Sequence, residues 1–236
     1  MNESLLIGIR GWEHDEWQDG FYDDALPTEW RLCYYSNIIR SVLVPAQKWE
    51  SVSAADLNQW IEDIDEGFRF VLELPAWVGD TAVPGFEKWQ QQIQQFQEMV
   101  RDLRPWLSAY LLRISSKESN LSTTWLQGRL EALDDGLPVC VDLPMGSIRT
   151  GQMLELLNAF GASLCWRPNQ EPKPEEPGEF MVALMGQSEL KPLRAVVEQL
   201  GDWMGDNRGA GLFFTEPDPA PQLAEQVRII AELLDV

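Results

Sequence analysis

Short apolar runs of strand length alternate along this chain with longer segments in which apolar residues recur every three or four positions. The short runs predict eight β-strands. These strands are Leu5–Ile9, Ser41–Val44, Phe68–Leu74, Tyr110–Ile114, Pro138–Leu143, Ser163–Trp166, Phe180–Met185 and Gly211–Thr215. Strands that alternate with helices favour a parallel sheet covered by helices.

The intervening segments carry helix signals. Thr28 predicts an N-cap for a helix that runs through Ile38, and Ser53 predicts another, with Asp56 in its first turn. Pro84 opens a segment whose apolar stripe continues to Leu103, which is typical of a helix packed on a sheet. Further helices are predicted over Ser122–Leu133, Thr150–Phe160, Ser188–Trp203 and Ala220–Leu234.

One connection lacks a helical period. Arg167–Glu179 contains four prolines and predicts an extended loop. Neither a Gly-x-Gly-x-x-Gly motif after the first strand nor a Walker loop is present, so the sequence does not favour an open nucleotide-binding sheet. Eight strands in 236 residues predict an α/β fold, a (β/α)8 TIM-like barrel. We expect a single domain over residues 1–236, with the sixth helix reduced or absent.

The charge composition of the chain limits the kinds of partner that it can bind. The chain has 18 Lys and Arg against 38 Asp and Glu, a formal net charge of −20, which makes nucleic acid an improbable partner. The apolar run near the N-terminus is too short for a signal peptide, and no stretch approaches the ~18 residues of a membrane span. We therefore expect a cytoplasmic protein without membrane contact.

Cysteine and histidine are scarce. Cys33, Cys140 and Cys165 are widely spaced and form no Cys-x-x-Cys motif, so we expect free thiols in a reducing compartment. His14 is the only histidine, which makes a zinc site improbable. The sequence predicts no protein metal site and identifies no cofactor.

The first strand and the loop after it carry a motif. Ile7–Tyr22 reads IGIRGWEHDEWQDGFY and resembles the opening signature of the domain of unknown function 72 family. Trp60 followed by Gly67–Phe70, and Ala220 with Pro221, resemble later motifs of that family. The residues of the first motif that match in register are Gly8, Gly11, Trp12, Trp17, Gly20, Phe21 and Tyr22. The resemblance spans most of the chain and implies a TIM-like barrel. It implies no specific reaction.

The chain departs from the family at several strand ends. The family typically carries polar side chains there, including an acid and an amide on the second strand. This chain instead has Val42–Trp49, Asp142–Met145, Ala183–Gly186 and Phe214–Glu216 at the corresponding positions. Sites of (β/α)8 barrels lie at these carboxyl ends. The departures favour a barrel whose catalysis is impaired or lost.

Three charged residues interrupt otherwise apolar strands: Glu73, Arg113 and Asp142. Because both faces of a barrel strand are largely buried, each charge needs a partner. One interpretation is a catalytic site in which the carboxylates form a general acid/base pair and Arg113 holds one of them ionised. The other is a salt-bridged plug inside the barrel, with Arg10 as its fourth member.

Other candidates for ligand binding lie just after the strands. His14, among three acidic neighbours, is either a general base, a metal ligand or a solvated histidine whose pKa those acids raise. Tryptophans at strand ends either stack on a sugar or a base, or pack beneath the loops. The residues in question are Trp12, Trp17, Trp49, Trp77 and Trp166, with Arg167 beside the last, and Arg10 is a further candidate for ligand binding.

These observations leave several functional hypotheses. The leading one is an impaired or non-catalytic barrel that binds a protein partner or a small ligand at its mouth. The second is a hydrolase or lyase that uses Glu73 and Asp142, with a divalent metal as an option. Phosphodiester chemistry on nucleic acid is a third, and the acidic charge disfavours it. The sequence assigns no oligomeric state.

Overall fold

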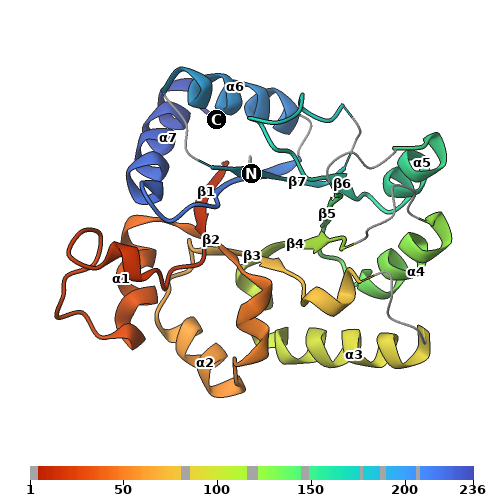
Figure 1. The fold of residues 1–236 in the computed structure, drawn as a ribbon, viewed down its shortest axis with the longest axis horizontal. Helices are drawn as coiled ribbons and strands as arrows, with labels where there is room; N and C mark the ends of the chain where they lie inside the picture. The colour runs from red at the N-terminus through yellow and green to blue at the C-terminus, as the bar shows by residue number, and fades with distance from the viewer. Residues whose placement is uncertain are drawn as a thin grey trace.

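The computed structural model describes residues 5–80, 86–115, 122–144, 149–175, 178–186, 190–205 and 208–236. Eight parallel strands form one sheet in the order β6-β5-β4-β3-β2-β1-β8-β7 (Figure 1). The strands are β1 Leu6–Arg10, β2 Ser41–Val44, β3 Arg69–Glu73, β4 Leu107–Arg113, β5 Val139–Asp142, β6 Ser163–Leu164, β7 Phe180–Met185 and β8 Gly209–Phe214. All eight predicted strands are therefore present, with ends shifted by up to three residues.

The two edge strands of this sheet approach each other through Trp166, just after β6. Its backbone N–H donates to the carbonyl of Val182 at 2.9 Å, and its carbonyl accepts from the N–H of Leu184 at 2.8 Å. This short pairing nearly closes the sheet on itself. The predicted α/β (β/α)8 barrel is confirmed.

Helices cover the outside of the barrel (Figure 1). They are α1 Arg31–Ile38, α2 Ala54–Glu62, α3 Phe86–Met99, α4 Thr123–Leu133, α5 Gly151–Ala159, α6 Leu190–Met204 and α7 Ala220–Leu234. Between β6 and β7, residues 165–175 and 178–179 contain no helix. The prediction that the helix after the sixth strand is reduced or absent is thus confirmed for the described part of this connection, and α6 follows β7.

The helix starts test the cap predictions. The Ser53 hydroxyl accepts from the backbone N–H of Asp56, whose carboxylate accepts from the N–H of Ser53 at 2.7 Å, so a capping box begins α2. The prediction for Thr28 is wrong. A 3-10 turn over Thr28–Trp30 precedes α1, so the N-cap of the turn is Pro27 and the N-cap of α1 is Trp30. Pro84 lies outside the described residues.

The predicted helix through Leu103 is divided in two. The α-helix α3 ends at Met99, and the chain continues as a 3-10 helix over Arg101–Trp106 that contains Pro105. The larger part of the apolar core lies between the sheet and these outer helices. Within the described residues, no helix is long and apolar enough to cross a membrane.

A smaller core fills the inside of the barrel. Because successive residues of a strand face opposite sides, every second residue points inward. The buried inward-facing residues include Leu43, Val71, Leu111, Cys140, Cys165, Val182 and Phe213. The three cysteines are free thiols: Cys33 is exposed, and the other two lie in this interior. Two residues further along β3, β4 and β5, the inward positions hold Glu73, Arg113 and Asp142.

Candidate functional site

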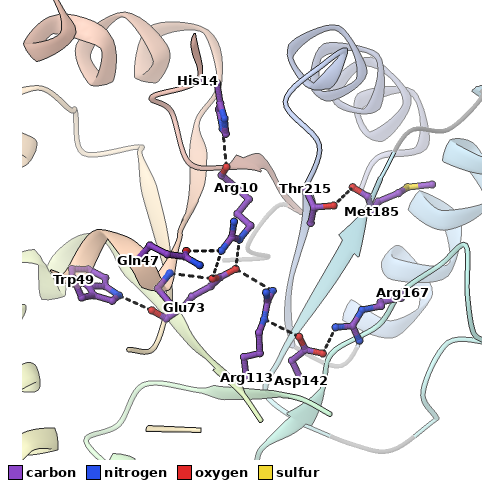
Figure 2. Close-up of polar contacts among 11 residues, drawn as sticks. Arg10, His14, Gln47, Trp49, Glu73, Arg113, Asp142, Arg167, Met185 and Thr215 are labelled. Atoms are coloured by element: carbon purple, nitrogen blue, oxygen red, sulfur yellow. Dashed lines mark hydrogen bonds and ion pairs between the residues drawn. The ribbon is translucent and has the colours of Figure 1, made fainter. Parts of the chain in front are cut away.

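Five charged side chains meet at the carboxyl ends of the strands (Figure 2). Arg10, Glu73, Arg113 and Asp142 end β1, β3, β4 and β5, and Arg167 follows β6. We call these five residues the rim arc. Ion pairs link them in that order, so that positive and negative groups alternate and each end is an arginine. The structure thus joins the three predicted charges with Arg10, as the plug interpretation expected, and adds Arg167.

Glu73 is only 1% exposed, and its carboxylate is fully engaged. Oε1 accepts from Arg10 Nε at 2.6 Å and from Arg113 Nη2 at 3.1 Å. Oε2 accepts from Arg10 Nη2 at 2.8 Å and from the backbone N–H of Ala46 at 3.0 Å. The hydrogen bond to Glu73 raises the pKa of Arg10 despite the opposing effect of burial. Glu73 therefore ties the ends of β1, β2 and β4 to β3.

Asp142 is equally buried but less completely bonded. Its Oδ1 accepts from Arg167 Nη2 at 2.5 Å. Its Oδ2 lies 3.1 Å from Arg113 Nε, a contact of opposite charges, yet no donor among the described residues gives this oxygen a hydrogen bond. Burial alone would lower the pKa of Arg167, but Asp142, together with Cys165 and Glu171, outweighs burial and the pKa is raised. Among the described residues, one buried carboxylate oxygen of the arc, Asp142 Oδ2, thus accepts no hydrogen bond.

Arg113 occupies the centre of the arc. Its side chain is 42% exposed, against 23% for Arg10 and 21% for Arg167. The backbone at Arg113 is held by Gly79, where an added Cβ would lie 1.7 Å from the Arg113 carbonyl oxygen, so only glycine permits this approach. This close contact fixes the position of the Arg113 backbone, while its side chain is partly open to solvent.

His14 lies above Arg10 and not among the charges. Its Nε2 donates to the backbone carbonyl of Arg10 at 2.9 Å, and its ring lies 4.4 Å from that of Trp17. Burial lowers the pKa of His14 more than nearby groups such as Glu16 raise it. The interpretation as a solvated histidine with a raised pKa is therefore wrong, because the loop folds over the ring.

The predicted tryptophans pack beneath the loops. Trp12 is 3% exposed and meets Trp60 edge to face at 4.9 Å. Trp166 is 2% exposed, and its Nε1 donates to the carbonyl of Glu171 at 3.0 Å. Trp49 and Trp77 are half-buried against the core, and Trp49 donates to the Glu73 carbonyl at 2.6 Å. Trp12 and Trp166 have little surface left on which a ligand can stack.

Two partners of the arc carry no signal in the sequence. Gln47 Oε1 accepts from Arg10 Nη2 at 2.9 Å, and the backbone N–H of Ala46 binds Glu73. Across the mouth, the Thr215 hydroxyl donates to the Met185 carbonyl at 3.3 Å. Among the described residues, no group of three or more acidic, histidine or cysteine side chains is placed to hold a metal ion.

Comparisons with known proteins agree with this architecture. A family described as "Protein of unknown function DUF72" matches residues 6–233. A DUF72 family protein from Thermotoga maritima MSB8 superposes with a TM-score of 0.75 at 14% identity, over 98% of this chain and 100% of the other. One from Enterococcus faecalis V583 gives 0.75 at 15% identity, over 97% and 95%.

A more distant barrel is also similar. A xylose isomerase domain protein from Alicyclobacillus acidocaldarius superposes with a TM-score of 0.53 at 14% identity, over 98% of this chain and 97% of the other. No curated protein matches the chain. At these identities the structural likeness concerns the fold alone.

Proposed function

This chain belongs to the DUF72 family, and from that barrel scaffold we propose that its mouth binds a small anionic ligand without catalysing a reaction. The observation that carries the proposal is the charge of the rim arc. Three guanidinium groups face two carboxylates, so the arc holds one positive charge in excess, and its central arginine is also its most exposed.

The position and chemistry of the arc support an anion. Ligands of (β/α)8 barrels bind at the carboxyl ends of the strands, where the arc lies. A guanidinium group matches the paired oxygens of a carboxylate or a phosphate. Since the chain as a whole carries a formal charge of −20, an anion meets repulsion over most of the surface. A local excess of arginine is the feature that overcomes this repulsion.

A second candidate function, the predicted hydrolase or lyase, has one observation in its favour. All four hydrogen bonds of Glu73 are made to the protein, which leaves that carboxylate no free acceptor for a substrate proton. Asp142 Oδ2 does have one. An enzyme built on this site would therefore use Asp142 as its base, and its test is a turnover that Asp142→Asn abolishes.

The binding proposal is tested by titrating the protein with inorganic phosphate and with citrate, by calorimetry and by thermal unfolding. At 100 times its dissociation constant a ligand adds about 2.7 kcal/mol to the free energy of unfolding, which moves the melting temperature by several degrees. Because phosphate also stabilises proteins non-specifically, Arg113→Met is compared with wild type at equal ionic strength.

The matched control is Arg228→Met, which removes the same charge from an exposed arginine of α7 that pairs with Glu232. We expect Arg113→Met to lose at least tenfold in affinity, because a hydrogen-bonded charge pair contributes about 1.5–3 kcal/mol. We expect Arg228→Met to bind like wild type. Absence of binding by every anion, or equal losses in the two variants, contradicts the proposal.

A further inference from the structure

We infer that the anion bound at the mouth also carries a hydroxyl group, which donates a hydrogen bond to Asp142 Oδ2. The inference rests on the proposed anion site and adds the class of ligand, a small hydroxylated carboxylate or phosphate. It is based on a difference between the two carboxylates of the arc, which are equally buried and unequally bonded.

The inference begins with Asp142 Oδ2, a buried oxygen that accepts no hydrogen bond from the described residues. Buried polar atoms nearly always have a hydrogen-bond partner, and a charged oxygen without one is unusual. Asp142 is 1% exposed, and no described residue donates to its Oδ2. Glu73, two strands away in the same arc, has both oxygens filled. Among the described residues, Asp142 Oδ2 therefore has room for a further donor, which a bound ligand supplies in this proposal.

The surroundings of Oδ2 select the kind of donor. Arg113 and Arg167 flank the Asp142 carboxylate, with contacts of 3.1 and 2.5 Å (Figure 2). A ligand ammonium group placed there would be repelled by both guanidinium groups. A hydroxyl group is neutral and donates a hydrogen bond without this repulsion, so it is the donor that fits.

The same contacts explain why the hydroxyl and the anion belong to one ligand. Arg113 covers Oδ2, and it is the most exposed arginine of the arc. A ligand anion that draws the Arg113 guanidinium towards itself uncovers the oxygen beside it. The hydroxyl therefore lies one or two carbon atoms from the anionic group, as in a 2-hydroxy acid or a glycerol phosphate.

The test compares pairs of ligands that differ by the hydroxyl alone. Glycolate is titrated against acetate, and 2-hydroxyethyl phosphate against ethyl phosphate, by calorimetry with the wild-type protein. We expect the hydroxylated member of at least one pair to bind about tenfold tighter or more, since the hydrogen bond is made to a buried charged oxygen. The pair with the larger ratio shows whether the anion is a carboxylate or a phosphate.

Two variants that remove the same charge locate the effect. In Asp142→Asn the amide oxygen stays with Arg167, and the amide nitrogen replaces the free acceptor. We expect the ratio to fall below about threefold, while the unhydroxylated anion binds as well as before or better. In Glu73→Gln the free oxygen of Asp142 is unchanged, so the preference for the hydroxyl persists.

The outcomes separate the two proposals. If the unhydroxylated anions bind through Arg113 and the wild-type ratios are near one, the inference is wrong and the anion site stands. If no anion of either pair binds, the inference is wrong, and the anion site is wrong as well when phosphate and citrate also fail to bind. The wild-type measurements alone decide between these outcomes, even if a variant fails to fold.

Discussion

The two halves of the rim arc are built from the same residue types and differ in how completely they are bonded. On the β3 side, Glu73 accepts four hydrogen bonds, from Arg10, Arg113 and the backbone of Ala46. On the β5 side, Asp142 accepts one hydrogen bond from the described residues, from Arg167, and has an ion pair with Arg113. Each carboxylate is 1% exposed, so burial does not distinguish them.

The difference shows that one ion-paired network can have two roles. A buried carboxylate with every acceptor filled connects the strand ends, and its contribution is to stability. A buried carboxylate oxygen that accepts no hydrogen bond makes the folded state less stable than it could be. Buried polar atoms without a partner are rare, and they occur preferentially at functional sites. We therefore propose that the β3 half of the arc contributes to stability and the β5 half to recognition.

The largest effect is expected from Glu73→Ala. This variant leaves Arg10, Arg113 and the Ala46 N–H without their acceptor. Breaking a buried ion pair costs about 3–5 kcal/mol, and we expect about 3 kcal/mol because both arginines reach solvent. Urea unfolding followed by tryptophan fluorescence measures the loss.

Glu98→Ala is the control for that loss. Glu98 pairs with Arg101 one turn along the chain, and both side chains are more than half exposed. Exposed pairs of this kind contribute well under 1 kcal/mol. Equal losses in Glu73→Ala and Glu98→Ala would show that the β3 half does not hold the barrel mouth together.

A smaller effect is expected from Asp142→Asn. The amide oxygen keeps a hydrogen bond to Arg167, and what is lost at Oδ2 is the ion pair with Arg113, whose side chain is 42% exposed, so we expect a loss of about 1–2 kcal/mol in the free energy of unfolding. The same urea experiment measures it. A loss larger than that of Glu73→Ala would reverse the assignment of stability to the β3 half.

The contrast between the halves also shows how far a sequence can predict such a site. Glu73, Arg113 and Asp142 are recognisable because a charge inside an apolar strand is costly without a partner. Strand alternation then places all three on the inward face. Arg167 lies in a loop, where an arginine is ordinary, so nothing in the sequence indicates that it pairs with Asp142.

Hydrogen bonding within the site is harder to predict than its charges. The bond from the Ala46 N–H to Glu73 depends on the path of the backbone after β2, to which any residue type contributes the same donor. The start of a helix is likewise hard to predict from a single residue. Ser53 and Asp56 reveal a cap because two side chains must cooperate, whereas Thr28 alone does not show whether the turn begins before or after it.

The smallest expected effect is the dependence of stability on pH. It concerns the β3 half of the arc, because His14 is hydrogen-bonded to the backbone of Arg10. Burial lowers the pKa of His14 below 6.5 in the folded protein, so the unfolded chain binds the proton more readily. The stability that depends on neutral His14 is therefore complete above about pH 6.5 and is lost as the pH falls through the lowered pKa.

His14→Gln stays neutral and keeps a side-chain N–H for the Arg10 carbonyl. We expect the urea midpoint of wild type to fall more steeply with acid than that of His14→Gln, and parallel curves would show that His14 is not linked to folding.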